Sequence, residues 1–253
     1  MYSEIWSALA ASNGGGEILN RDGVLMISAG GKWPVMNTAF MTSPVTTEAD
    51  LQDRILTAKR YYGPKKTLWL FISFNEWLDS SIAIEEVSWN HGLYHMQNCI
   101  GMQTWRLPEP RSSAPELVFR LVENDVDRVA FFDINADSYG FSPEWSNDIA
   151  CWASRWPTEN VRLYIAHCGN EAVSSAMVYL NGDVAYLGFV ATRQGHQRQG
   201  YAEAIARYAM ASASENGRFT KSILHSTPAG LSLYRGLGYS EVTTFGIYMG
   251  ACE

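Results

Sequence analysis

The hydrophobic and polar residues in the second half of the chain follow two different periods, which predict its secondary structure. Alternating or continuous apolar runs between turn residues indicate strands over residues 116–124, 160–168, 171–180, 183–192, 222–227 and 241–250. Apolar residues at helical spacing indicate helices over residues 125–140, 142–156, 197–216 and 228–238. The short Gly-Asn and Asn-Gly-Asp connections between the middle strands are typical of hairpins and predict an antiparallel meander. This order of elements predicts an α+β fold, with a mixed central sheet flanked by helices.

The first half of the chain shows a similar order of elements. Its pattern predicts strands over residues 34–42, 67–73 and 93–103, and helices over residues 47–63 and 78–92. The same order recurs over residues 183–250, and several pairs of segments keep an offset of roughly 150 residues. We therefore interpret the chain as an internal duplication whose first copy is degenerate.

A segment rich in proline and serine separates the two halves. Residues 107–116 hold three prolines and two serines between apolar patterns. Such a segment is stiff and solvated, as linkers are. We expect a degenerate domain over residues 1–106, a linker over residues 107–115 and a complete domain over residues 116–253.

The formal net charge of −7 limits the partners of this protein. It repels nucleic-acid backbones and anionic membranes, so neither is an expected partner, whereas a cationic small molecule would be attracted. The cysteines and histidines show no metal-ligand spacing, and no metal site is expected. No segment has the apolar length of a membrane span, and the N-terminal residues lack the pattern of a secretory signal. We expect a soluble, cytoplasmic protein with reduced thiols.

A glycine-containing turn joins the strand at residues 183–192 to the helix that begins near Gln197. The first turn of a helix presents N–H groups without an intrahelical acceptor, and its dipole favours negative charge. Gly200 leaves room for an anion to approach this backbone, and Arg198 or Arg193 adds positive charge. The turn is therefore predicted to bind a phosphate group.

The corresponding helix of the first half, at residues 47–63, lacks these features. Its start has no glycine and carries Glu48, Asp50 and Asp53, whose carboxylates repel anions. We expect the first half to bind no phosphate group there.

The spacing Gln197-x-x-Gly200-x-Ala202 resembles the R/Q-x-x-G-x-G/A signature of the GNAT superfamily of N-acetyltransferases. A second block, residues 224–242, resembles the closing strand and helix of the same family, and the likeness extends over roughly residues 160–250. Two positions depart from the commonest pattern. Gln197 stands where arginine is commoner, and Gln194 stands where many relatives have proline.

The resemblance implies acetyl-CoA as the acetyl donor, and it implies which residues bind it. The turn would hold the pyrophosphate, and the preceding strand, which splays from its neighbour in this family, would pair with the pantetheine arm. The residues implied to bind acetyl-CoA are Phe189, Val190, Ala191, Thr192, Gln197, Arg198, Gln199, Gly200, Tyr201, Ala202, Ser226 and Tyr234.

Two catalytic residues are expected. The resemblance implies that Tyr234 protonates the leaving thiolate, as a tyrosine of the last helix does in this family. Relatives often carry a glutamate as the base on the strand before the turn, and this chain has none there. His225 is one candidate for the proton acceptor, because it adjoins Ser226, close to where the family places the thiol. A water chain is an alternative, as are three further side chains: Glu171, His167 and Asp183.

The resemblance implies an N-acetyltransferase that moves an acetyl group from acetyl-CoA to a primary amine of a small molecule, by direct attack in a ternary complex. Two alternatives stay open. The chain could be a non-catalytic acyl-CoA-binding sensor or interaction module, or it could acetylate the N-terminus or a lysine of a protein. The sequence also leaves open whether the protein forms a homodimer.

Overall fold

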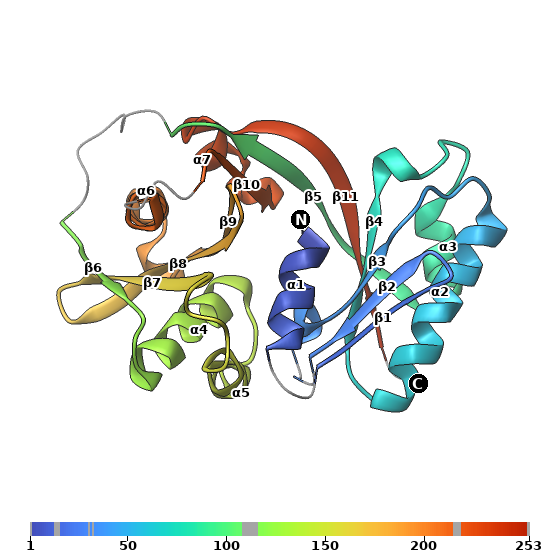
Figure 1. The fold of residues 1–253 in the computed structure, drawn as a ribbon, viewed down its shortest axis with the longest axis horizontal. Coiled ribbons are helices and arrows are strands. Elements are labelled where there is room, and N and C mark those ends of the chain that lie inside the picture. Colours follow the sequence, from blue (N-terminus) through green and yellow to red (C-terminus); the bar gives the residue numbers. More distant parts are fainter. Residues whose placement is uncertain are drawn as a thin grey trace. The chain divides into compact units, whose positions relative to one another are not determined.

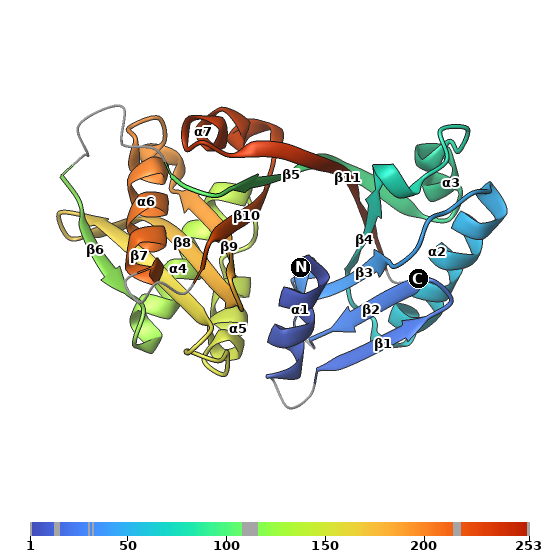
Figure 2. The ribbon, with the colours of Figure 1, turned by 45° about the horizontal axis from the view of Figure 1, so that its top comes forward.

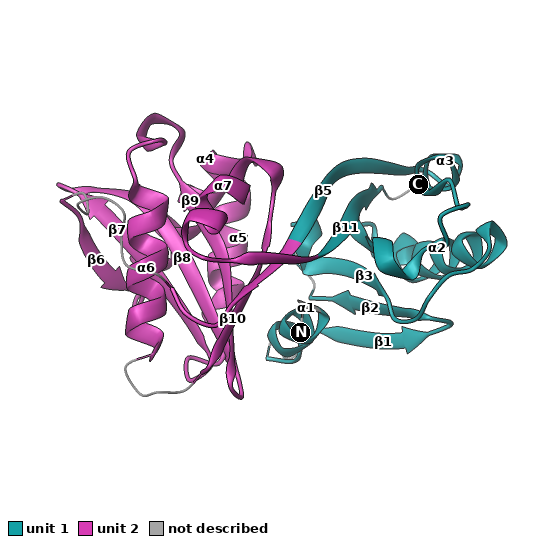
Figure 3. Ribbon diagram, turned by 90° about the horizontal axis from the view of Figure 1, so that it is seen from above, with its two compact units in different colours: residues 1–100, 243–253 teal, residues 101–242 magenta. Residues whose placement is uncertain are grey.

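The computed structural model describes residues 2–12, 16–29, 31, 33–107, 116–214 and 219–251. The chain divides into two compact units, drawn in two colours in Figure 3. Unit 1 comprises residues 1–100 and 243–253, and unit 2 comprises residues 101–242.

Unit 2 is built on a sheet whose strands follow the order β10-β9-β8-β7-β6. These strands are β6 (Val118–Leu121), β7 (Val161–Cys168), β8 (Glu171–Asn181), β9 (Val184–Thr192) and β10 (Lys221–Ser226). The pairs from β6 to β9 are antiparallel, which confirms the predicted meander, and β9 and β10 are parallel.

Helices cover both faces of this sheet, so its central strand β8 is buried along almost its whole length. Figure 1 shows α6 on one face, and α4 with α5 on the other. The helices of this unit are α4 (Asp125–Tyr139), α5 (Glu144–Ala153), α6 (Tyr201–Ser214) and α7 (Leu231–Gly236), with 3-10 segments at Gln194–His196 and Pro228–Gly230.

Unit 1 contains a second sheet region, with the strand order β1-β2-β3-β4-β11. Figure 2 shows β1 to β4 side by side, with α2 and α3 on one face and α1 on the other. The elements are α1 (Tyr2–Ala11), β1 (Glu17–Arg21), β2 (Val24–Ser28), β3 (Asn37–Met41), α2 (Glu48–Tyr62), β4 (Trp69–Phe74), α3 (Ile84–Asn90), β5 (Leu93–Thr104) and β11 (Ser240–Gly250), with 3-10 segments at Pro34–Met36, Gly63–Lys65 and Asn75–Trp77. A buried core centred on Tyr62, Trp69 and Phe71 joins α2 to the sheet.

The division of the chain differs from the predicted one at two places. The last strand, β11, pairs in antiparallel with β4, from Phe245 opposite Phe74 to Gly250 opposite Trp69. Residues 243–253 therefore belong to unit 1, and residues 101–106 belong to unit 2. All of the expected linker except Leu107 lies outside the described residues.

Both units contain a strand, a helix and a parallel strand in sequence. In unit 1 these are β3, α2 and β4, and in unit 2 they are β9, α6 and β10. The connection before α2 in unit 1 thus corresponds to the glycine turn before α6 in unit 2.

Candidate functional site

The neighbouring strands β9 and β10 pair only at their beginnings. Their register runs from Lys221 opposite Val184 to Ile223 opposite Tyr186, although β9 continues to Thr192. Beyond Tyr186, one edge of β9 is therefore open. The structure places Phe189, Val190, Ala191 and Thr192 on this open part, where Phe189 and Val190 are partly exposed. A strand edge of this kind offers backbone N–H and C=O groups to an extended ligand.

A bulge lies in the middle of the open part of β9. The register of β9 against β8 shifts between Ser175 and Met177, whose partners are Ala191 and Gly188. Phe189, inside the bulge, has a φ of 49°. A bulky residue in this left-handed region is an outlier that costs on the order of 1–3 kcal/mol, and it persists only where its surroundings hold it.

A chain of hydrogen bonds holds the bulge in place. The Ser175 hydroxyl donates to the carbonyl oxygen of Phe189 at 3.0 Å, and Asn135 Nδ2 donates to the Ser175 Oγ atom at 3.0 Å. The rings of Phe131 and Phe132, on the same helix as Asn135, lie 6.0 and 6.1 Å from the Phe189 ring. Helix α4 thus fixes the conformation of β9 where its edge is open.

The glycine turn leads from this open strand into α6. Arg198 and Gly200 both have positive φ, at 65° and 81°. The first bond of the helix runs from the N–H of Ala204 to the carbonyl of Gly200. Within the described part of the chain, no acceptor is present for the N–H groups of residues 198–203.

These free N–H groups face space that an anion can enter. A Cβ atom built on Gly200 would meet nothing within 4 Å, and the exposed guanidinium of Arg198 has no partner among the described residues. The one carboxylate in the first turn of α6, Glu203, accepts a bond from Arg207 at 2.9 Å. Unpaired amides, the helix dipole and the exposed guanidinium of Arg198 are the features that the sequence analysis expected of a phosphate-binding turn.

The remaining expected residues of the turn differ in their surroundings. Gln197 Nε2 donates to the carbonyl of Thr192 at 3.3 Å, so its side chain folds back onto the end of β9. Tyr201 is buried, and its hydroxyl donates to the thiol sulfur of Cys168 at 3.5 Å. Gln199 is exposed and Ala202 is partly buried. The N–H groups of Gln199, Tyr201 and Ala202 have no acceptor among the described residues, whereas the side chains of Gln197 and Tyr201 hold the turn to the sheet.

Tyr234 and Ser226 lie close together beside β10. A Cβ atom built on Gly230 would be 3.1 Å from both the Ser226 Oγ atom and the Tyr234 ring. Burial raises the pKa of Tyr234 well above its usual value, and the nearby Tyr139 and Tyr239 raise it further. The phenol therefore stays protonated at any ordinary pH. No hydrogen bond uses its hydroxyl within the described residues.

His225 is hydrogen-bonded to Tyr186, a residue that the sequence analysis missed. The Tyr186 oxygen and His225 Nδ1 are 2.6 Å apart, and the two rings are stacked. Burial lowers the pKa of His225 to about 4, so the imidazole is neutral at pH 7. The Tyr186 ring lies over Gly188, where a Cβ atom would be 2.5 Å from it. Since Tyr186 is the last residue of β9 that pairs with β10, this Tyr–His pair marks the point where the strands separate.

The other candidate bases lie elsewhere in unit 2. His167 is on β7, which β8 separates from β9, and burial lowers its pKa. Glu171 Oε2 lies 3.2 Å from His196 Nε2, within hydrogen-bond distance. Asp183 is in the hairpin between β8 and β9, at the end of β9 away from the glycine turn. Among the predicted bases, only His225 lies where the strands separate.

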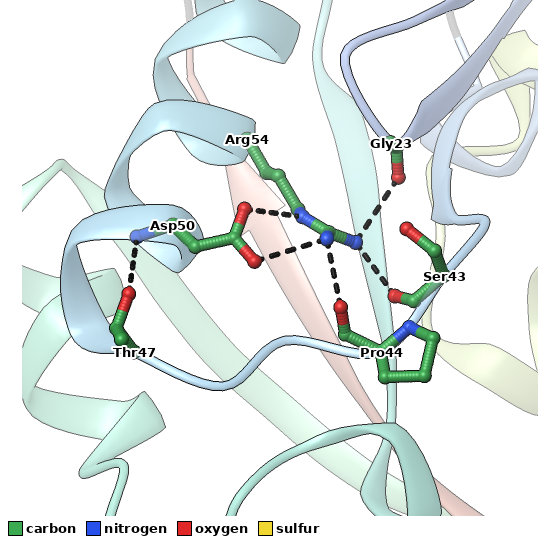
Figure 4. A network of polar contacts seen from close by, with 6 residues as sticks. All are labelled: Gly23, Ser43, Pro44, Thr47, Asp50 and Arg54. Atoms are coloured by element: carbon green, nitrogen blue, oxygen red, sulfur yellow. Dashed lines mark hydrogen bonds and ion pairs between the residues drawn. The ribbon is translucent and has the colours of Figure 1, made fainter.

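The connection before α2 in unit 1 differs from the glycine turn. Helix α2 is capped by Thr47, whose side chain accepts from the N–H of Asp50 at 3.1 Å. The guanidinium of Arg54, whose side chain is almost fully buried, occupies the concave side of this connection, as Figure 4 shows. The anionic residues Asp50 and Asp53 lie beside it, with Asp22, around one hollow.

All the N–H donors of Arg54 are used inside the protein. Its Nε and one terminal nitrogen bind the two oxygens of Asp50, at 3.0 Å each. The terminal nitrogens also donate to the carbonyl oxygens of Gly23, Ser43 and Pro44. The connection thus turns carbonyl groups toward an internal cation, whereas the turn before α6 offers N–H groups. This contrast gives a structural reason for the expected lack of phosphate binding in unit 1.

Comparison with known proteins agrees with this geometry. Residues 128–239 match the model of the acetyltransferase (GNAT) family, so this part of the chain is a domain of that family. The predicted family and the α+β fold class are thereby confirmed. No curated protein matches the chain in sequence.

Several solved structures share the fold. A GCN5-related N-acetyltransferase from Kribbella flavida has a TM-score of 0.71 and 18% identity, over 99% of this chain and 95% of that one. A GCN5-related N-acetyltransferase from Sphaerobacter thermophilus has a TM-score of 0.63 and 12% identity, over 92% and 82%. A tandem GNAT protein from the clavulanic acid biosynthesis pathway has a TM-score of 0.54 and 9% identity, over 90% and 78%.

Within the described residues, no group of three or more His, Cys, Asp or Glu side chains is arranged to hold a metal ion. In the same part of the chain, no helix has the length and apolar character needed to cross a membrane.

Proposed function

We propose that this protein transfers the acetyl group of acetyl-CoA to a primary amine of a small molecule. One observation carries the proposal: the open edge of β9 leads directly into a turn whose N–H groups have no acceptor among the described residues. An extended arm that ends in a diphosphate is complementary to both features. When bound, acetyl-CoA supplies an acetyl group activated as a thioester.

The chain's own residues would hold the donor at three points. The N–H groups of residues 198–203, with Arg198, bind the diphosphate, because Gly200 leaves the approach open. The backbone of residues 189–192 pairs with the amide groups of the extended arm. Ser226 and Tyr234 lie beside the neighbouring strand, where the arm would end.

Two proton transfers are needed, because an alkyl amine is protonated near pH 7 and the thiolate that leaves must gain a proton. Tyr234 is the proton donor, since its hydroxyl is protonated and has no partner in the described part of the chain. His225 is the proton acceptor in this proposal, since its ring is neutral at pH 7 and lies where β9 and β10 separate. Tyr186 orients this ring through Nδ1.

Only the net charge of the protein indicates which kind of amine accepts the acetyl group. The net charge of −7 favours a cationic amine over an anionic one. A sensor that only binds acyl-CoA has no need of an unpartnered phenol at Tyr234, which favours the catalytic alternative. Acetylation of a protein N-terminus or lysine would use the same donor site. The duplication, a homodimer and a cytoplasmic location all stay predictions.

Replacing Tyr234 by Phe tests the catalytic role. We expect the variant to bind acetyl-CoA with unchanged affinity and to lose about 10²–10⁴-fold in kcat, the usual contribution of a general acid. Thiol release with a panel of small amines measures kcat, and calorimetry measures the affinity. Equal turnover in Tyr234→Phe and the wild type would reject Tyr234 as the proton donor, whereas acetyl-CoA binding without turnover in the wild type would favour the sensor alternative.

A further inference from the structure

Helix α4 is attached to the glycine turn by two hydrogen bonds between Asp137 and Gln194. The N–H of Gln194 donates to Asp137 Oδ2 at 2.8 Å, and Gln194 Nε2 donates to the carbonyl oxygen of Asp137 at 2.9 Å. Asp137 lies in the last turn of α4, three residues before the helix ends at Gly140. Gln194 is the first residue of the 3-10 segment that begins the turn. A long-range contact thus fixes the first residue of the turn.

The same helix also holds the bulge of β9. Asn135 is fully buried and is only two residues from Asp137, and it holds Phe189 through the Ser175 hydroxyl. One rigid helix therefore contacts the open strand near its bulge and again just after its end. The distance between the bulge and the free N–H groups of the turn is set by these two attachments.

The carboxylate of Asp137 stands in a position that electrostatics alone disfavours. The turn is built to bind an anion, and a negative charge beside it lowers the affinity for a diphosphate. The carboxylate donates no proton to the turn and accepts one hydrogen bond from a backbone N–H. Its contribution is therefore the position of its oxygen, and the charge itself is a cost.

We propose that Asp137 is a positioning residue for the acetyl-CoA turn, acting through its two hydrogen bonds to Gln194. The proposal rests on the proposed function, since it assumes that the turn binds the diphosphate of acetyl-CoA. Asp137 contacts neither donor nor acceptor in this account. It keeps the turn in the conformation that presents the N–H groups of residues 198–203.

The local backbone offers a sharp control for this proposal. Arg193, before Gln194, has φ −48° and ψ 141°, which is the extended conformation that a following proline requires. Proline is also favoured at the first position of a helical turn, where its fixed φ suits the backbone. Gln194→Pro therefore removes both donors to Asp137 and restrains the same turn by its ring.

The experiment measures acetyl-CoA affinity by calorimetry in four variants of the full chain. We expect Asp137→Ala to weaken binding about tenfold, which corresponds to the loss of one hydrogen bond to a charged acceptor. Asp137→Asn keeps an acceptor oxygen and loses the charge, so its affinity should equal or exceed that of the wild type. Gln194→Pro should bind like the wild type. The double variant Asp137→Ala with Gln194→Pro should bind acetyl-CoA with an affinity within about threefold of the wild type. The proline ring restrains the turn in place of the lost hydrogen bond from Gln194 to Asp137.

Hydrogen exchange of the Gln194 N–H, measured without acetyl-CoA, gives an independent readout. It should be protected in the wild type and in Asp137→Asn, and exchange faster in Asp137→Ala. If Asp137→Ala does not fold, Gln194→Ala, which removes only the side-chain bond, replaces it and should weaken binding by a smaller factor.

Three results would overturn the positioning role while leaving the proposed function intact. They are wild-type affinity in Asp137→Ala, equal weakening in Asp137→Ala and Asp137→Asn, and no recovery in the double variant. A wild-type protein that does not bind acetyl-CoA would instead reject the proposed function, and the positioning role with it.

Discussion

Tyr186 on β9 and His225 on β10 are joined by a hydrogen bond of 2.6 Å at the point where these two strands stop pairing. The partners come from segments 39 residues apart in the chain. Their rings are stacked, and the Tyr186 ring covers Gly188. The pair therefore has a fixed orientation at the beginning of the open edge of β9.

The pKa of His225 should lie far below that of an ordinary histidine. Burial disfavours the charged imidazolium, so the midpoint should lie near pH 4 and not near 6.5. Since the folded pKa is depressed, the folded state binds fewer protons than the unfolded state between pH 6.5 and pH 4. The contribution of His225 to stability thus falls as the pH decreases through this window. An NMR titration of the imidazole, assigned with His225→Gln, measures the midpoint.

The same variant tests the role of His225 as proton acceptor. His225→Gln should lose about 10²–10⁴-fold in kcat with little change in acetyl-CoA affinity. Tyr186→Phe is the matched control. Tyr186→Phe should lose much less in kcat than His225→Gln. The midpoint of the His225 titration in this variant should stay near pH 4, because burial and not the hydrogen bond lowers the pKa of His225. Full turnover by His225→Gln would assign proton removal to another group, such as a water chain.

Arg54 should stabilise unit 1 without contributing to acetyl-CoA binding. Replacing it by Leu leaves three carbonyl oxygens and the Asp50 carboxylate without their partner, and we expect a loss of about 3–5 kcal/mol in unfolding free energy. Arg54→Lys should also destabilise, because an ammonium group cannot bind both Asp50 oxygens and the carbonyls at once. Denaturant unfolding measures the loss.

Acetyl-CoA titration of folded Arg54→Lys provides the functional control. The affinity should equal that of the wild type, with one molecule bound per chain. A stoichiometry of two in the wild type would contradict the account of unit 1, since the α2 connection would then bind the ligand as well.

The sequence predicted most elements of both units because their hydrophobic periods are local signals. It missed the hairpin of β1 and β2, although Asp22 and Gly23 form its two-residue turn, with φ of 50° and 76°. Asp-Gly between apolar residues is a strong signal for this turn type and could have identified the hairpin. The pairing of β11 with β4 could not be predicted in the same way, because the pattern of one strand does not specify its partner.

The candidate site shows the same limit. The turn around Gly200 could be predicted, because its residues are adjacent in the sequence and its chemistry depends on the backbone. The contacts of Tyr186 with His225 and of Asp137 with Gln194 join residues 39 and 57 positions apart, and no local pattern indicates them. The sequence did show that the strand before the turn has no carboxylate. Under the family resemblance, this absence indicated that another group would act as the base.

The most direct test of the central claim is a calorimetric titration of acetyl-CoA into the wild type and two glycine variants. Gly200→Glu places a carboxylate in the space where the diphosphate would bind. Gly182→Glu is the matched control, because Gly182 also has a positive φ and open space around it, but lies at the other end of β9. Both variants impose similar backbone strain, and only one adds charge to the turn.

We expect wild type and Gly182→Glu to bind acetyl-CoA with a micromolar dissociation constant, and Gly200→Glu to lose measurable binding. Binding by Gly200→Glu as tight as that of the wild type would contradict the assignment of the turn. No binding by the wild type would contradict the proposed function itself.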